Sequence, residues 1–99
     1  MARVIIWSLR AAEDIEAIAA YITQDSEAYA TSVIRKIIQK TRLSAEFPDI
    51  GRIVPEFGDE SIREIFAYSY RIIYKVSPEE IVVTAVIHGR QILDISLKP

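Results

Sequence analysis

The chain has 99 residues, enough for one hydrophobic core and too few for two, so we expect a single domain over residues 1–99. It is 51% hydrophobic and 26% charged, which is typical of a globular protein, and its formal net charge of −2 does not favour nucleic acid as a partner. The lack of cysteine excludes a disulfide framework, a thiol nucleophile and a zinc–thiolate site, and no apolar run is long enough to cross a bilayer. We therefore expect a cytoplasmic protein without a signal peptide and without membrane contact.

The N-terminal half predicts one strand and two helices. Residues 3–7 are mostly β-branched or aromatic and predict a strand, after which Ser8 is suited to cap a helix. Apolar residues then recur at helical spacing: Ala11, Ile15, Ile18, Ala19 and Ile22. A polar break at residues 24–26 precedes a second helix, predicted over residues 27–46. The short link predicts an antiparallel helical hairpin, which Pro48 ends.

The charges are unevenly distributed along these helices. An acidic group lies in the N-terminal third: Glu13, Asp14, Glu16, Asp25 and Glu27. A basic group follows on the second predicted helix: Arg35, Lys36, Lys40 and Arg42. A charged helix face is most often simply solvated, so we assign no site to the basic group.

The C-terminal half predicts three strands, at residues 62–66, 70–76 and 81–88, which short turns should join into an antiparallel meander. The element order is then β-α-α-β-β-β, and we predict an α+β fold in which the first strand and the helical hairpin pack on a small antiparallel sheet. The last strand is apolar on both faces, yet the hairpin can cover only one of them. The sheet's own curl, the segment 91–97 or a second protein must cover the other, and we favour a partner-binding apolar surface.

Arginines recur in the strand-rich half, and they are the candidate anion-binding residues: Arg52, Arg63, Arg71 and Arg90. Arginine is costly to bury without a partner, so these side chains indicate an ordered electropositive surface, on which the last three would converge on one side of the meander. Such a surface would hold a carboxylate or a phosphate. The alternative is that the arginines pair with the chain's own Glu56, Glu64 and Asp94.

His88 is the only histidine of the chain. With Glu56 it would form an acid–base pair for RNA cleavage, in which a base deprotonates a 2′-hydroxyl, an acid protonates the leaving oxygen and arginines stabilise the charge between them. Nothing in the spacing brings the two side chains together, so we favour a structural role for this histidine.

Three tyrosines of the meander, Tyr68, Tyr70 and Tyr74, could stack on bases, but packing is the more common role for tyrosine in a strand. Metal-ligand spacing, a phosphate-loop glycine pattern and a nucleophile elbow are absent. We therefore expect neither a metal nor a cofactor.

Short motifs occur in a fixed order along nearly the whole chain: Trp7-Ser8, Ala11-Ala12 before Asp14-Ile15, Tyr21-Ile22, Phe47-Pro48, Gly51-Arg52, Val54-Pro55-Glu56, Arg63-Glu64, Tyr70-Arg71-Ile72-Ile73-Tyr74 and His88-Gly89-Arg90. Each motif is weak alone, but together their order and spacing are specific. In this respect the chain resembles the toxins of the RelE/ParE superfamily from bacterial type II toxin–antitoxin modules. The β-α-α-β-β-β order agrees with the fold that this resemblance implies.

The resemblance implies a cytoplasmic toxin that inhibits growth, as in plasmid stabilization systems, and that a small antitoxin neutralises by wrapping around it. The resemblance also implies that the protein assembles as a homodimer or as a toxin–antitoxin hetero-oligomer. RelE-like members cut mRNA in the ribosomal A site, whereas ParE-like members poison DNA gyrase and lack the nuclease residues.

The ParE-like branch is favoured by the slightly acidic charge and by the ending His88-Gly89-Arg90, since His88 falls one residue short of the nuclease histidine. We favour a gyrase inhibitor over an enzyme, with four partner-binding candidates: Arg52, Arg63, Arg71 and Arg90. The alternative is a ribosome-dependent mRNA endoribonuclease with four candidate catalytic residues: Arg71, Arg63, Glu56 and His88. A third interpretation is an interaction module without toxicity.

Overall fold

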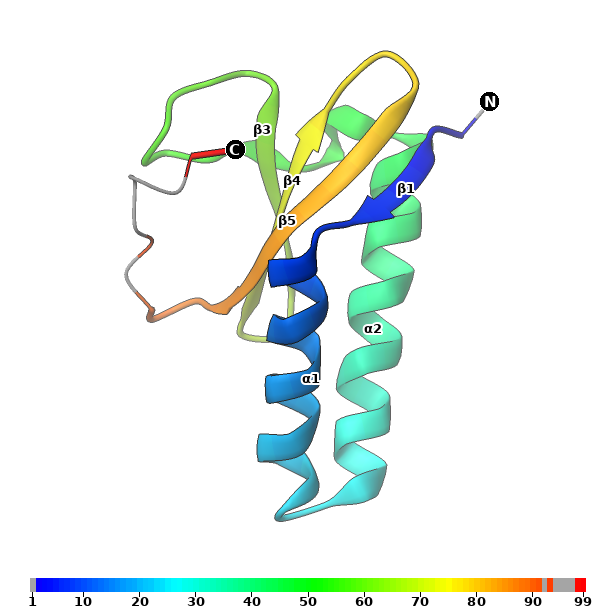
Figure 1. Ribbon diagram of the computed structural model, residues 1–99, viewed down its shortest axis with the longest axis vertical. Helices are drawn as coiled ribbons and strands as arrows, with labels where there is room; N and C mark the ends of the chain where they lie inside the picture. The colour runs from blue at the N-terminus through cyan, green and yellow to red at the C-terminus, as the bar shows by residue number, and fades with distance from the viewer. Residues whose placement is uncertain (1, 92, 94–97) are drawn as a thin grey trace.

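Two helices lie side by side on one face of a five-stranded sheet (Figure 1). This computed structural model describes residues 2–91, 93 and 98–99. The elements in chain order are β1 (Val4–Trp7), α1 (Leu9–Thr23), α2 (Glu27–Glu46), the short 3-10 helix η1 (Pro48–Ile50), β2 (Arg52–Ile53), β3 (Ile62–Ala67), β4 (Tyr70–Val76) and β5 (Glu80–His88). The predicted α+β class and the predicted order of the main elements are confirmed.

The sheet is mixed, with strand order β1-β5-β4-β3-β2. Strands β3, β4 and β5 form the predicted antiparallel meander. Strand β1 adds to it in parallel orientation, with Ile5 opposite Ile81, and the two-residue β2 pairs antiparallel with the outer edge of β3. Neither feature was predicted, because pairing direction depends on the path of the connection and two residues are too few to show an alternating pattern.

Serines begin both helices. Ser8 Oγ accepts a hydrogen bond from the Ala11 N–H at 3.1 Å, and Ser26 Oγ accepts one from the Tyr29 N–H at 3.1 Å. Each bond satisfies a backbone donor that the first turn of a helix leaves without a partner. The predicted cap at Ser8 is confirmed, and the break at residues 24–26 supplies the second cap.

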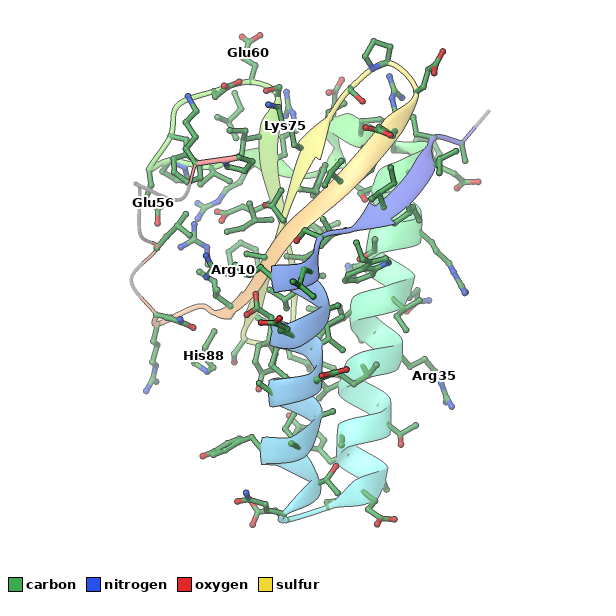
Figure 2. All side chains as sticks on the ribbon, viewed as in Figure 1. Arg10, Arg35, Glu56, Glu60, Lys75 and His88 are labelled. Atoms are coloured by element: carbon green, nitrogen blue, oxygen red, sulfur yellow. The ribbon has the colours of Figure 1, made fainter. Side chains whose placement is uncertain are left out.

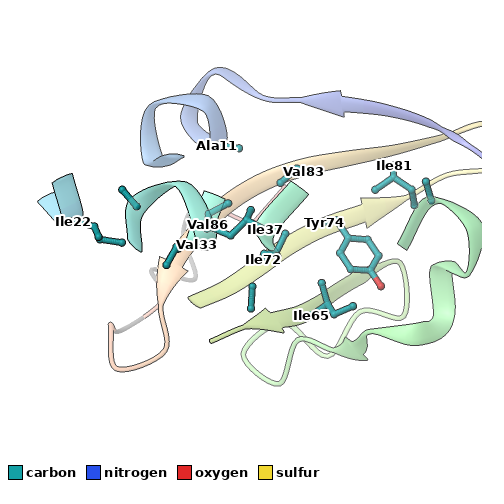
Figure 3. Close-up of a cluster of buried hydrophobic side chains, with 13 residues drawn as sticks. Ala11, Ile22, Val33, Ile37, Ile65, Ile72, Tyr74, Ile81, Val83 and Val86 are labelled. Carbon is teal, nitrogen blue, oxygen red and sulfur yellow. The ribbon is translucent and has the colours of Figure 1, made fainter. Parts of the chain in front are cut away.

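The main core lies between the hairpin and the sheet (Figure 3). Its labelled members come from both helices and from three strands: Ala11, Ile22, Val33, Ile37, Ile65, Ile72, Tyr74, Ile81, Val83 and Val86. Burial of each large apolar side chain contributes about 1.5–3 kcal/mol. Tyr74 is fully buried, and its hydroxyl donates to the Pro48 carbonyl at 2.8 Å and accepts from the Gly51 N–H at 3.1 Å. Its polar tip therefore ties the chain after α2 to the sheet.

A second, smaller core covers part of the opposite face of the sheet: Val54, Ile62, Ile73, Ala85, Ile87 and Leu93, with Phe57 packed against them. The prediction that the last strand is buried on both faces is confirmed. The cover comes from the loop after β2 and from Leu93 of the segment 91–97, so this part of the face is covered by the chain itself and not by the second protein that we favoured. Residues 92 and 94–97 of that segment lie outside the described residues. Among the described residues, no helix combines the length and the apolar character that a membrane span requires.

Strand β5 is longer than its parallel neighbour β1, so part of its edge has no strand beside it. Side chains from the start of α1 bond to the backbone of β5 there instead. Strand β1 pairs with β5 only as far as Val83. Beyond that point Ser8 Oγ donates to the Thr84 carbonyl at 3.1 Å, and the Val86 N–H donates to Asp14 Oδ2 at 2.9 Å. Asp14 therefore stabilises the sheet, because a buried backbone donor without a partner is costly.

We expect Asp14→Ala to lower the free energy of unfolding by about 1–3 kcal/mol, because it leaves the Val86 N–H without its acceptor. Asp14→Asn retains an acceptor and should cost less. Urea denaturation measures both, with Glu13→Ala, an exposed neighbouring acid on the same helix, as the control. Equal effects at the two positions would contradict this role for Asp14.

Candidate functional site

Two of the four candidate arginines meet in a cluster of ion pairs, which we call the Arg–Glu cluster: Arg52, Glu56, Glu64 and Arg71. The two terminal nitrogens of the Arg71 guanidinium donate to the two oxygens of Glu56, each at 2.9 Å. Arg71 Nε donates to Glu64 Oε1 at 2.6 Å, and Arg52 Nε donates to Glu64 Oε2 at 2.5 Å. Glu64 is thus shared by both arginines.

The sheet register brings these residues together. Arg52 lies directly opposite Glu64 in the β2–β3 pair, and Arg71 lies opposite Phe66, one diagonal position from Glu64. The close approach of β2 to β3 depends on Gly51. A Cβ there would lie 2.6 Å from the Glu64 carbonyl oxygen, closer than real Cβ atoms approach other atoms.

Glu56 reaches the cluster from the loop after β2, which folds back onto the sheet. Val54 anchors this loop in the second core, and its carbonyl accepts from the N–H groups of Phe57 and Gly58 at 3.1 and 3.0 Å. Asp59 Oδ1 accepts from the Ser61 N–H at 2.9 Å and from the Ser61 hydroxyl at 2.7 Å. These bonds lower the pKa of Asp59 to about 2. The loop is therefore held in one conformation, with Glu56 against Arg71.

The cluster satisfies its charges internally. The side chain of Glu64 is 0% exposed and that of Arg71 is 8% exposed. A buried carboxylate is stable only where cations and hydrogen-bond donors replace water, and here two formal positive charges meet two formal negative charges. All three nitrogens of Arg71 are bound by carboxylates, so a phosphate would have to displace Glu56 to reach it. For Arg71 and Arg52, pairing with the chain's own carboxylates is confirmed.

This environment keeps Glu56 ionised. The hydrogen bonds from Arg71 hold the pKa of the Glu56 carboxyl below its ordinary value of 4.5, against the smaller opposing effect of burial. The bonds to Glu56 are also the largest cause of a raised pKa for Arg71. At neutral pH Glu56 is a carboxylate engaged by a guanidinium, which suits an ion pair better than a group that donates a proton.

His88 lies on the other face of the sheet. It pairs in register with Tyr70, which packs against the main core on the helix side, and its ring lies edge-on to the Tyr70 ring at a centroid distance of 5.6 Å. Its Nδ1 accepts from the Arg90 N–H at 3.2 Å. Glu56 and His88 are therefore apart (Figure 2), and the acid–base pair considered for RNA cleavage is not assembled.

Arg63 does not converge with Arg71, so that part of the expected arginine surface is wrong. Strands β3 and β4 are joined by a two-residue turn, which places Arg63 opposite Tyr74, on the helix side of the sheet. Arg63 donates to the Gly51 carbonyl at 3.0 Å and to the Glu60 carbonyl at 3.1 Å. Counting along the strands could not show this separation, because the face of a residue depends on the pairing register.

Arg90 lies exposed in the turn after β5, next to His88. Its proposed partner Asp94 lies outside the described residues. Among the described residues no group of three or more histidine, aspartate or glutamate side chains could hold a metal ion.

The sequence assigned no site to the helical hairpin, where the structure has a groove lined by α1, α2 and the N-terminal segment that contains β1. It consists of three adjoining hollows of about 850, 530 and 350 Å³. Its floor is mainly apolar: Ile5, Trp7, Ile15, Ala19, Ala30, Ile34 and Ile38. Its rim carries the four cations of the basic group of α2 together with Arg3, against two carboxylates, Glu27 and Glu46, and Arg42 lines all three hollows. We call this feature the hairpin groove; the signal for it was the basic group beside the apolar stripe.

We expect Arg71→Met to destabilise the protein by about 3–5 kcal/mol, because it removes the cation that holds buried Glu64 and bidentate Glu56. Lys75→Met, at an exposed cation of the same strand, should change the free energy of unfolding by less than about 0.5 kcal/mol. Chemical denaturation measures both. A cost below about 1 kcal/mol for Arg71→Met would show that Glu64 does not depend on this pair.

The ion pair of Glu56 should also make stability depend on pH. Because its pKa is lower in the folded chain than the ordinary 4.5, Glu56 contributes fully above that pH, and its contribution is lost as the pH falls through the folded value. The difference in free energy of unfolding between the wild type and Glu56→Gln should therefore shrink from about pH 6 to about pH 3. A difference that stays constant over this range would contradict the assignment.

The comparisons with known proteins agree with this fold. The family model described as "ParE toxin of type II toxin-antitoxin system, parDE" matches residues 5–93. No curated protein matches the chain. A solved structure described as the chromosomal ParDE TA system from P. aeruginosa has a TM-score of 0.70 and 17% sequence identity, over 87% of this chain and 95% of that one. At this identity the likeness concerns the fold, but the family match spans most of the sequence, and the chain belongs to the ParE toxin family of type II toxin–antitoxin systems.

Proposed function

We propose that this toxin acts in the cytoplasm by inhibiting DNA gyrase, and that a cognate antitoxin neutralises it by direct binding. The observation that carries the choice of target is the Arg–Glu cluster. An endoribonuclease needs arginines free to meet phosphate and an acid and base on one surface, whereas here Arg71 is bound by two carboxylates and His88 lies on the opposite face. These features support a toxin that acts by binding a protein.

The hairpin groove supports the antitoxin part of the proposal. An apolar floor with a basic rim is complementary to an amphipathic helix whose exposed side carries acidic residues. Ile34 and Ile38 both line the hollow of about 850 Å³, and Arg42 lines all three hollows. We infer that an acidic amphipathic segment of the antitoxin occupies this groove.

A supercoiling assay tests the target. The purified toxin should inhibit gyrase, its expression should induce the DNA-damage response, and mRNA on ribosomes should remain intact. Cleavage of mRNA within codons while gyrase works normally would replace the proposal with the ribosome-dependent endoribonuclease. A chain that does not arrest growth would favour an interaction module without toxicity.

A charge reversal tests the groove. Arg42→Glu should weaken antitoxin binding at least about tenfold, because it places a carboxylate against an acidic partner, and should leave gyrase inhibition unchanged. Lys75→Glu, at an exposed cation of β4 outside the hollows, is the matched control and should alter neither property. Titration calorimetry of both variants gives the comparison, and equal affinities would place the antitoxin elsewhere.

A further inference from the structure

The helical hairpin extends beyond the end of the sheet that it covers (Figure 1). Near the α1–α2 turn, side chains on the sheet-facing side of the hairpin therefore have no sheet to pack against. Tyr29 lies four residues before the fully buried Val33, and Tyr21 lies seven residues after Asp14, which bonds to β5, so both project from the sheet-facing side. Each is more than half exposed.

The end of the sheet adds further aromatic side chains beside them. The rings of Tyr29 and Tyr68 have centroids 6.3 Å apart, and Tyr70 contacts His88. Burial is the main cause of a raised pKa for Tyr70, and the nearby hydroxyls of Tyr29 and Tyr21 raise it further. Four of the five tyrosines of the chain thus gather where the hairpin leaves the sheet. We call them, with His88, the tyrosine surface.

The backbone at Tyr68 favours a binding role for this residue. Its φ of 54° is the one positive value at a non-glycine residue among the residues that the structure describes. Tyr68 is the first residue of the two-residue turn between β3 and β4, a position where glycine or asparagine is less strained. The chain accepts this strain while the ring is more than half exposed, so the ring contributes little burial in return. Strain of this kind is common at binding sites.

The charge around the surface selects its partner. Residues 11–34, which include Tyr21 and Tyr29, contain five acidic residues and neither lysine nor arginine. Asp25 and Glu27 are exposed at the hairpin turn between the two tyrosines in sequence. Tyrosine faces attract cations, most strongly arginine, and carboxylates nearby reinforce the attraction. Arg90 is an exposed cation next to His88.

We propose that the tyrosine surface is where the toxin binds its target protein, and that it takes an arginine or lysine side chain of that protein against the tyrosine rings. This inference rests on the proposed function, in which the toxin acts by binding a protein. None of the tyrosines of this surface lines the hairpin groove, although Glu27 of the acidic turn also lines one hollow of that groove. Toxicity and antitoxin binding are therefore separable by mutation.

The decisive variants are Tyr29→Ala and Tyr68→Asn. Both should weaken gyrase inhibition and growth arrest about tenfold or more, because tyrosines at the centre of an interface dominate binding. Antitoxin affinity should be unchanged. Tyr68→Asn should also be at least as stable as the wild type in urea, because asparagine tolerates the positive φ, a combination that a purely structural role for Tyr68 would not produce. Asp25→Lys should weaken inhibition as well, since it opposes a cation.

Leu9→Ala is the matched control, since Leu9 is a highly exposed apolar residue at the opposite end of α1. Inhibition at the wild-type level by the tyrosine variants would overturn the inference and leave the proposed function standing. Joint loss of toxicity and antitoxin binding would also overturn the inference. A change in self-association, measured by light scattering, without a change in gyrase inhibition would overturn it as well. If the wild type arrests growth without affecting gyrase, the proposed target is wrong. Loss of growth arrest in the tyrosine variants would then still support the tyrosine surface as the binding site for the target, and unchanged arrest would overturn it. A wild type that arrests nothing overturns both.

Discussion

The buried carboxylate of Glu64 is the constraint on which the sheet face opposite the helices depends. It has no exposed surface, so it is stable only while Arg71 and Arg52 reach it from the neighbouring strands. Arg71 also holds Glu56, and through it the loop whose Val54 belongs to the second core. Ion pairs and apolar cover therefore stabilise one another here. A shift of one residue in the pairing would separate Glu64 from both arginines, so the cluster also specifies the alignment of β2, β3 and β4.

The same interaction determines what the arginines can do. A guanidinium bound on all sides by carboxylates has little attraction left for phosphate, whereas an open arginine on a sheet would attract RNA. The structure pairs Arg52 and Arg71 with the chain's own acids and holds His88 on the other face. In a family of toxins, this arrangement favours binding to a protein partner over cleavage of an RNA substrate. The stabilising cluster and the two surfaces proposed for binding thus occupy different parts of the molecule.

The helical hairpin presents two surfaces of opposite chemistry. Between its helices and β1, the hairpin groove combines an apolar floor with a mainly basic rim around Arg42. At its end, the tyrosine surface lies beside the acidic turn that contains Asp25 and Glu27. The uneven charge along the chain, which a net charge of −2 conceals, thereby gives the hairpin a mainly basic groove and an acidic turn. Such patches favour different partners and steer their approach.

The sequence by itself determined the helices, the meander and the two-sided burial of β5, because these follow from local periodicity, capping serines and the apolar content of one segment. It also offered the pairing of Arg71 with Glu56 and Glu64 as one of two open interpretations. Only the tertiary structure decided between them, and only it separated Arg63 from Arg71, because the face on which a strand residue lies depends on a register that one sequence does not display. The parallel addition of β1 and the gathering of the tyrosines were likewise beyond the sequence, since both depend on how segments distant along the chain pack together.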